Sequence, residues 1–379
     1  MRDPRVDKLA SILVRYSTAV KKGDNVVIQA SPKAEALCTA VYREVLRAGG
    51  HPWIRMAPSE CAEIFFNHAK PEQLAHVSPF DKHVMKTTNV YLNLGAPDNT
   101  KSLSGIDPRK QAASSQARRA IFDVFMKRAA LPHDDPRRLR WSGTVFPNQA
   151  SAQDAEMSLR SYENFVFGAC KLDHDNPVAS WKKLGRSQQR LADFLTNGKE
   201  MHIRAPNGTD IRFGIEGRTW INCDGKENFP DGEVFTGPIE NATEGTVCYS
   251  FPAVHGGREV NGIRLVFKAG KVVDCSATHN EEFLIGMLDQ DKGARVLGEL
   301  ALGSNYDIKR YTKNTLFDEK IGGTFHAALG AAYPESGGTN KSGLHWDMVC
   351  DLRKGGTVEV DGKLVSKNGR FQKASWPQP

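Results

Sequence analysis

Long hydrophobic runs are missing from this sequence of 379 residues. No apolar stretch approaches the roughly 20 residues that a membrane-spanning helix needs. The first residues, MRDPR, are charged and lead into an amphipathic segment rather than into the apolar core of a signal peptide. We therefore expect a cytoplasmic protein that does not associate with a membrane.

Paired cysteines are also missing. The seven cysteines are scattered, their number is odd, and no two form a C-x-x-C pair. This pattern argues against a disulfide framework and against a zinc site built from thiolates. We expect reduced cysteines that act mostly as small buried apolar residues.

Nucleotide and nucleic-acid signatures are absent as well. Neither G-x-G-x-x-G nor G-x-x-x-x-G-K-[ST] follows a strand-like segment of the first half. The net charge is +7, and its densest region, residues 109–140, carries basic doublets every nine residues. Nine residues turn a helix by about two and a half turns, so successive doublets point to opposite sides. Aromatic residues are sparse there too, which favours solvated helix faces over a nucleic-acid partner.

The first half alternates helical and strand patterns. The length itself favours two domains. Leu9, Ile12, Leu13 and Tyr16 have the spacing of a helix with one buried face, and short apolar strands are expected at 26–28, 53–54 and 90–92. Ser31-Pro32 begins a second helix that ends near residues 49–50. Helices between short buried strands predict a parallel α/β layer.

The second half has a different pattern. A helix at 181–195 is followed by strand-like segments joined at Asn207-Gly208, Ala269-Gly270, Asp361-Gly362 and Asn368-Gly369, which are dipeptides typical of hairpins. The fold class is thus α/β, with a parallel α/β scaffold domain at 1–190 and a mainly antiparallel β domain with helices at 191–379. We expect the second domain to carry the metal site.

Two histidine segments are candidates for chemistry. His326 lies in a run rich in glycine and alanine, and a helix over 324–333 would place His326 and Tyr333 on one face. In a strand, His345 and Asp347 would point the same way and present an imidazole beside a carboxylate. Such a set suits zinc, cobalt, manganese or iron. The structural alternatives are a core histidine in the first segment and a surface pair in the second.

Two glutamates stand among apolar neighbours. Glu233 follows a turn, and Glu299 is enclosed by glycine and aliphatic residues. An isolated carboxylate in such a place is costly to desolvate. A bound cation removes that cost, and a buried arginine or lysine partner is the structural alternative.

Taken in order, several segments resemble the metalloaminopeptidase family of aminopeptidase T and aminopeptidase S, the thermophilic aminopeptidases. The likeness covers nearly the whole chain, beginning at 3–10 and 42–49 and continuing through 162–167 and 175–181. Its strongest parts are DGEVFT at 231–236, LGE at 297–299, FDE at 317–319, HAALG at 326–330 and HWD at 345–347. Only the combination is specific.

The resemblance implies an aminopeptidase that acts on short peptides and holds two divalent ions, with zinc, cobalt or manganese as the candidates. The implied metal residues are Glu233, Glu299, Glu319, His326, Tyr333, His345 and Asp347. It also implies a homodimer whose active sites face an enclosed cavity. Two departures stand out: Gly322-Gly323 lengthens the connection from Glu319 to His326, and the connection from Tyr333 to His345 is short.

The chemistry of these residues agrees with hydrolysis. Two cations polarise a carbonyl and lower the pKa of water between them. Glu299 is our first candidate for the general base, and Tyr333 is the candidate donor to the oxyanion.

Two other classes of protein are considered. His326, His345 and Asp347 alone would suit a mononuclear non-haem iron ring-cleaving dioxygenase, and some dihydroxypyridine dioxygenases resemble this scaffold. Glu233, Glu299 and Glu319 are surplus for one iron, which favours the hydrolase. A metal-free binding protein is disfavoured because every ligand type is retained. His255 and His279 are expected to be surface residues.

Overall fold

The computed structural model describes residues 3–132 and 134–379 and divides the chain into two compact units. We call Met1–Val178 with Gly225–Phe229 the N-terminal unit, and Ala179–Asp224 with Pro230–Pro379 the C-terminal unit. Whether the units fold and act as the predicted domains 1–190 and 191–379 stays a prediction, because compactness is not independent folding.

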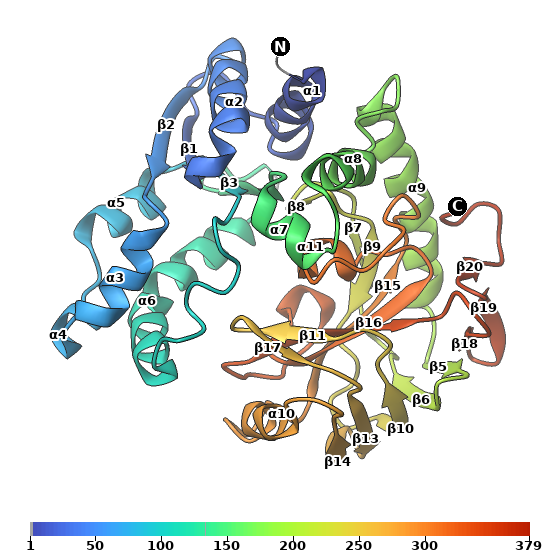
Figure 1. Ribbon diagram of the computed structural model, residues 1–379. Coiled ribbons are helices and arrows are strands. Elements are labelled where there is room, and N and C mark those ends of the chain that lie inside the picture. Colours follow the sequence, from blue (N-terminus) through green and yellow to red (C-terminus); the bar gives the residue numbers. More distant parts are fainter. Residues whose placement is uncertain (1–2, 133) are drawn as a thin grey trace. The chain divides into compact units, whose positions relative to one another are not determined.

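The N-terminal unit contains a parallel sheet with the strand order β2-β1-β3-β4-β8 (Figure 1). Its strands are β1 (Asn25–Ala30), β2 (His51–Met56), β3 (Val90–Gly95), β4 (Arg140–Val145) and β8 (Asn228–Phe229). The apolar runs at 26–28 and 90–92 form the buried β1 and β3, as predicted. The predicted parallel α/β layer is thus confirmed.

The helices that begin in this unit are α1 (Pro4–Ile12), α2 (Glu35–Arg47), α3 (Glu60–His68), α4 (Pro71–Leu74), α5 (Pro79–Thr87), α6 (Pro108–Ala129), α7 (Gln149–Asp154), α8 (Leu159–Ala169) and α9 (Pro177–Thr196). Helix α1 begins with a side-chain cap, since the Asp3 side chain accepts a hydrogen bond from the Arg5 backbone and Pro4 follows the cap. The basic doublets lie on α6, as the helical reading requires.

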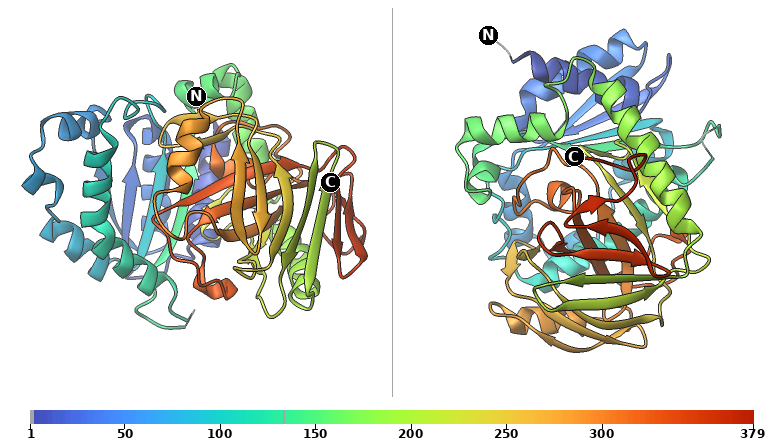
Figure 2. Two further views of the ribbon diagram at one scale, coloured as in Figure 1. Left: turned by 90° about the horizontal axis from the view of Figure 1, so that it is seen from below. Right: turned by 90° about the vertical axis from the view of Figure 1, so that its right-hand side faces the viewer.

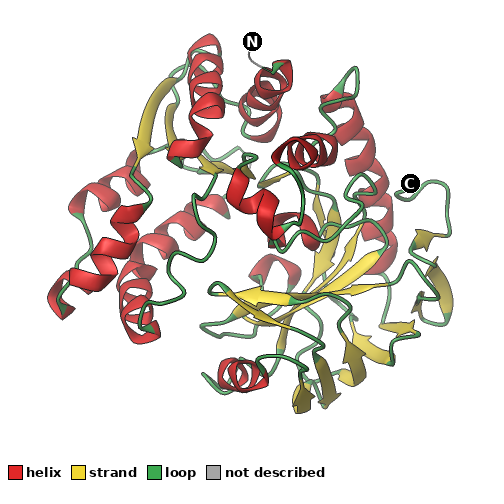
Figure 3. Cartoon of the chain, viewed as in Figure 1, coloured by secondary structure: helices red, strands yellow, loops and turns green. Residues whose placement is uncertain are grey.

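Strands make up much of the C-terminal unit (Figure 3), and the strand pairs within its two larger sheets are antiparallel. One sheet has the order β14-β13-β10-β6-β5-β18-β19-β20 and the other β17-β16-β15-β9-β7. The strands of the first are β5 (Glu200–Ala205), β6 (Thr209–Gly214), β10 (Thr243–Cys248), β13 (Arg264–Lys268), β14 (Lys271–Ser276), β18 (Thr357–Val360), β19 (Lys363–Lys367) and β20 (Arg370–Phe371). Those of the second are β7 (Ile221–Cys223), β9 (Glu233–Thr236), β15 (Leu297–Gly303), β16 (Thr324–Gly330) and β17 (His345–Asp351).

All four predicted hairpins are present. The pairs β5–β6, β13–β14, β18–β19 and β19–β20 are antiparallel, and each is joined at one of the four dipeptides. The second residue of each dipeptide is a glycine with positive φ, and such φ values suit glycine best. A short pair, β11 (Ala253–His255) with β12 (Arg258–Val260), and the helices α10 (Glu281–Leu288) and α11 (Thr315–Asp318) complete the unit.

Helix α9 runs beside the strands of the C-terminal unit (Figure 2), and the core of the unit is one cluster of buried side chains from α9 and from both large sheets. Leu191 and Leu195 of α9 are fully buried in one cluster with Met201, Phe213 and Phe325. Each fully buried aliphatic or aromatic side chain contributes roughly 1.5–3 kcal/mol. The second sheet, which carries the histidine segments, packs into this core through one of its faces.

The predicted helix over 324–333 is wrong. Thr324–Gly330 is strand β16, and all of its residues are buried between β15 and β17. A short apolar run has the same local pattern in a buried strand and in a buried helix, so its neighbours in the sheet decide.

The cysteines and the helices bear on two further expectations. The cysteines are free, but Cys61 is exposed and only Cys38, Cys170 and Cys350 are fully buried. Among the described residues, no helix combines the length and the apolar character required to cross a membrane.

Candidate metal centre

Four strands of the second sheet carry five of the seven predicted site residues. Glu233 begins β9, Glu299 lies on β15, His326 on β16, and His345 and Asp347 on β17. The prediction that His345 and Asp347 share a strand is confirmed.

Small residues leave room on the face that carries these side chains. Ala328 of β16 lies opposite Glu299 on one side and Asp347 on the other, and Ala301 lies opposite His326. Residues opposite one another in neighbouring strands share a face, so the two alanines flank the charged groups without filling the space between them. The register shifts between Leu297 and Glu299, and such a bulge re-aims the following side chain.

Glu299 is the centre of the arrangement, and its side chain is 6% exposed. Its Oε1 lies 3.4 Å from His326 Nε2, and its Oε2 lies 3.3 Å from His345 Nε2. His326 Nε2 is also 3.5 Å from Glu233 Oε2, and His345 Nε2 is 3.6 Å from Asp347 Oδ2. The two oxygens of Glu299 therefore face two different imidazoles.

These donors fit divalent cations. Three groups each have donor atoms within 4.8 Å of one another: Glu233, Glu299 and His326; Glu299, His345 and Asp347; and Glu319, His326 and Asp347. Glu233 Oε2 and Asp347 Oδ1 are buried without a hydrogen-bond partner in the described part of the chain. Unsatisfied buried carboxylate oxygens beside imidazole nitrogens are the donor set that zinc, cobalt or manganese takes.

The imidazole of His345 has a defined orientation. Its Nδ1 lies 2.9 Å from the carbonyl oxygen of Ala331, which can only accept, so Nδ1 donates. In the neutral ring, Nε2 then carries the free lone pair and faces Glu299 and Asp347. A hydrogen bond of this kind commonly orients histidines that bind metals.

Opposite charges shift the pKa values of the two imidazoles. Burial alone would lower the pKa of His326, but the carboxylates of Glu233 and Glu299 raise it to about 9. Burial would also lower the pKa of His345, but the carboxylates of Asp347 and Glu299 outweigh this effect and raise it to about 10. Burial favours a neutral Glu299, but its bonds to both imidazoles hold the pKa of this carboxyl well below its usual range. Without metal, both imidazoles are therefore in the protonated, positively charged form at neutral pH.

Tyr333 lies at the edge of the same group. Its ring is 5.2 Å from that of His345 and 5.3 Å from that of Phe235, centroid to centroid. Burial, followed by the nearby carboxylates of Glu299 and Asp347, raises the pKa of its hydroxyl. Tyr333 therefore keeps its proton and is available as a hydrogen-bond donor. The structure thus brings all seven predicted site residues into one region.

Lys320 is a part of this region that sequence reasoning missed. Its side chain is 1% exposed, and its Nζ lies 2.7 Å from Glu233 Oε1 and 3.8 Å from Asp231 Oδ1. It also donates a hydrogen bond to Glu319 Oε1. The buried basic partner that was the structural alternative to a metal ion at Glu233 is therefore present, and Glu233 contacts both Lys320 and His326. Its one signal in the sequence is a charged residue between Glu319 and an apolar, glycine-rich run.

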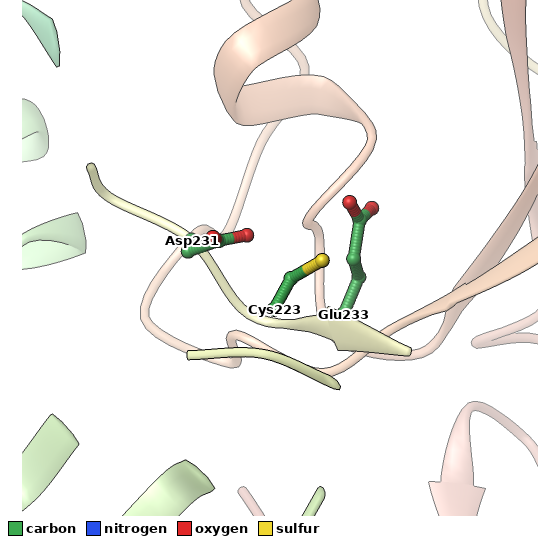
Figure 4. Close-up of side chains that lie close together, drawn as sticks. All are labelled: Cys223, Asp231 and Glu233. Atoms are coloured by element: carbon green, nitrogen blue, oxygen red, sulfur yellow. The ribbon is translucent and has the colours of Figure 1, made fainter. Parts of the chain in front are cut away.

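Two further residues adjoin Glu233 on this side. The donor atoms of Cys223, Asp231 and Glu233 lie within 4.8 Å of one another. Figure 4 shows the sulfur of Cys223 directed toward the Glu233 side chain, with the carboxylate of Asp231 extending toward the same space. Cys223 lies on β7 and Asp231 on the segment before β9, and their spacing in the sequence does not predict that they lie close together.

The remaining histidines have different surroundings. His279 is exposed, as expected. His255 is half-buried instead, with its ring 5.4 Å from that of Trp346, and burial lowers its pKa. Trp346 lies between His345 and Asp347 in the chain, so His255 packs behind the strand that carries them.

Comparison with known proteins identifies the family of the chain. Residues 2–371 match the family described as thermophilic metalloprotease (M29). Aminopeptidase T of Thermus aquaticus is 32% identical over 70% of this chain and 71% of its own length. Aminopeptidase 2 of Geobacillus stearothermophilus is 28% identical over 99% of this chain and 98% of its own length.

Solved structures give the same result for the fold. Wild-type AmpT from Thermus thermophilus superposes with a TM-score of 0.84 at 26% identity and covers 98% of this chain and 99% of its own. A 2,5-dihydroxypyridine dioxygenase from Pseudomonas putida KT2440 has a TM-score of 0.60 at 12% identity, with 98% of each chain covered, and is similar in fold alone. The chain therefore belongs to the thermophilic metalloprotease (M29) family, which makes it a hydrolase of the metalloaminopeptidase class.

Proposed function

We propose that this protein removes N-terminal residues from short peptides with the help of two divalent ions held by the centre described above. The observation that carries the proposal is the position of Glu299, whose two oxygens face two separate imidazoles. A carboxylate in that position suits a ligand shared by two ions. One ion would be held by Glu233, Glu299 and His326, and the other by Glu299, His345 and Asp347.

The ions would supply Lewis acidity, which polarises the scissile carbonyl and makes water a nucleophile near neutral pH. The chain's own residues would orient the peptide and move protons. Tyr333 is the proposed donor to the carbonyl oxygen as negative charge develops there, because its hydroxyl stays protonated.

We assign the general base differently from the expectation based on sequence. Glu299 was our first candidate, but both of its oxygens face imidazole nitrogens, so neither is left for the attacking water. Glu319 lies in one group with His326 and Asp347, and one of its oxygens is bound to Lys320. We propose that Glu319 takes the proton from water and passes it to the leaving amine.

Removal of metal tests the function. We expect the purified chain to contain two divalent ions and to release free amino acids from the N-termini of short peptides. A chelator should abolish the release, and addition of zinc, cobalt or manganese should restore it. One bound iron with consumption of oxygen would instead favour the dioxygenase, for which His326, His345 and Asp347 suffice and three glutamates are surplus.

Metal binding should also release protons. The pKa values of His326 and His345 without metal are about 9 and about 10, so both rings are protonated at pH 7.5 and must lose a proton to become ligands. Affinity is therefore expected to rise with pH between 7 and 9, because fewer protons have to be displaced. Calorimetry in buffers of different ionisation enthalpy measures the protons released, and a value near zero at pH 7.5 would contradict the assignment of these ligands.

The homodimer implied by the family resemblance is retained as a proposal. Its support is the outer strand β2, which stands at the edge of the parallel sheet and exposes Trp53, Ile54 and Met56. An exposed edge strand with apolar side chains is a place where a second chain can pair.

A further inference from the structure

The ammonium group of Lys320 contacts one oxygen of each of two glutamates and leaves their other oxygens unbound by it. Glu233 gives Oε1 to Lys320 at 2.7 Å and turns Oε2 toward His326 Nε2 at 3.5 Å. Glu319 likewise gives Oε1 to Lys320. Asp231, which is 1% exposed, approaches the same ammonium group at 3.8 Å. Two buried carboxylates, those of Asp231 and Glu233, and the partly buried carboxylate of Glu319 therefore surround one buried positive charge.

We propose that Lys320 is a positioning residue of the metal centre. It binds one oxygen each of Glu233 and Glu319, so that the second oxygen of each is left for the metals or the water. It also prevents metal ions from binding to the group of Cys223, Asp231 and Glu233. The inference rests on the proposed function, since it assigns to Lys320 a role in shaping the proposed ligands.

The exclusion of metal ions from the group of Cys223, Asp231 and Glu233 follows from the same contacts of Lys320. Cys223, Asp231 and Glu233 offer a sulfur and two carboxylate oxygens within 4.8 Å of one another, a spacing that one cation spans. Lys320 Nζ already contacts Glu233 and Asp231 of this group. A metal ion there would meet the ammonium group at close range, and like charges in a buried site repel strongly. The lysine thus limits metal ions to the side of Glu233 that faces the histidines.

A purely structural lysine and a positioning lysine give opposite results when the charge is removed. Loss of a merely structural ion pair would loosen the site and weaken metal binding together with activity. Loss of a positioning charge should strengthen metal binding, because three carboxylates then lack their internal cation. Activity should fall all the same, because Glu233 and Glu319 are no longer held in place.

The test is Lys320→Met, which keeps the length of the side chain and removes its charge. The full-length protein is stripped of metal and titrated with Zn²⁺ against a chromophoric chelator. We expect Zn²⁺ affinity to rise by about tenfold and kcat on a short peptide to fall by about tenfold or more, with a smaller change in KM. Lys199→Met is the control, because Lys199 forms an exposed ion pair with Glu216, and it should leave all three values unchanged.

Cadmium gives a second readout that does not depend on activity. In Lys320→Met the opened group should bind Cd²⁺ through the Cys223 sulfur, whose thiol releases its proton to the buffer, and so produce the ultraviolet thiolate-to-metal band. The band should be absent from the unchanged protein and lost again in the double variant Lys320→Met, Cys223→Ser. If Lys320→Met fails to fold, the double variant Lys320→Met, Asp231→Asn also removes the negative charge of Asp231 and is measured in its place.

The outcomes separate this inference from the proposed function. Weaker or unchanged Zn²⁺ binding in the variant, or the absence of the cadmium band, overturns the role of Lys320 and leaves the hydrolase intact. Failure of the unchanged protein to bind divalent ions would overturn the proposed function itself.

Discussion

Replacement of Glu299 by glutamine is expected to lower kcat/KM on short peptides by at least about a thousandfold. The change keeps the shape of the side chain but removes the negative charge that faces both His326 and His345. A neutral amide is a poor ligand for zinc, and here it would weaken both proposed metal positions at once. Metal content and kcat/KM should fall together, and both are measured on the same sample.

The matched control is Glu335→Gln, the same change at an exposed glutamate of the short helix Pro334–Ser336. It should retain full metal content and activity. If Glu299→Gln instead kept two ions and more than about a tenth of the activity, Glu299 would not be a shared ligand.

Tyr333→Phe is expected to lower kcat by roughly 10²–10³-fold while metal content stays unchanged. The variant removes only the hydroxyl and retains the ring that packs against Phe235 and His345. A donor that acts on developing negative charge contributes mainly in the transition state, so KM should change little. Steady-state kinetics together with metal analysis check both parts of this expectation.

Tyr306→Phe is the corresponding control, because its hydroxyl donates to the Gly369 carbonyl oxygen at 2.9 Å and plays no part in the proposed chemistry. A rise in KM with unchanged kcat for Tyr333→Phe would mean that the hydroxyl binds substrate only. A loss of metal would mean that Tyr333 is a ligand rather than a donor.

Much of the fold could be predicted from the sequence where local physics decides it. The asparagine-glycine and aspartate-glycine turns gave the correct hairpins because few other residues adopt the positive φ that tight turns need. The spacing of His345 and Asp347 was enough to predict that they point the same way, because in a strand residues two apart share a face. The parallel layer followed from alternating helices and short apolar runs.

The site was predicted less directly. Spacing alone left Glu233 and Glu299 open between a cation and a basic partner, and the resemblance to a known family supplied the combined set. Both readings apply to Glu233, which faces Lys320 with one oxygen and His326 with the other. The helix expected around His326 is wrong because a short, largely apolar segment takes its structure from its neighbours in the fold.

The sequence by itself determined the turns, the strand alternation, the parallel layer and the types of residue available for chemistry, because these depend on near neighbours in the chain. Only the tertiary structure decided that Glu299 stands between two imidazoles and that Lys320 shares a buried space with Glu233, Glu319 and Asp231. Those meetings join residues from separate strands and loops, and charges interact through space at distances that spacing along the chain does not specify.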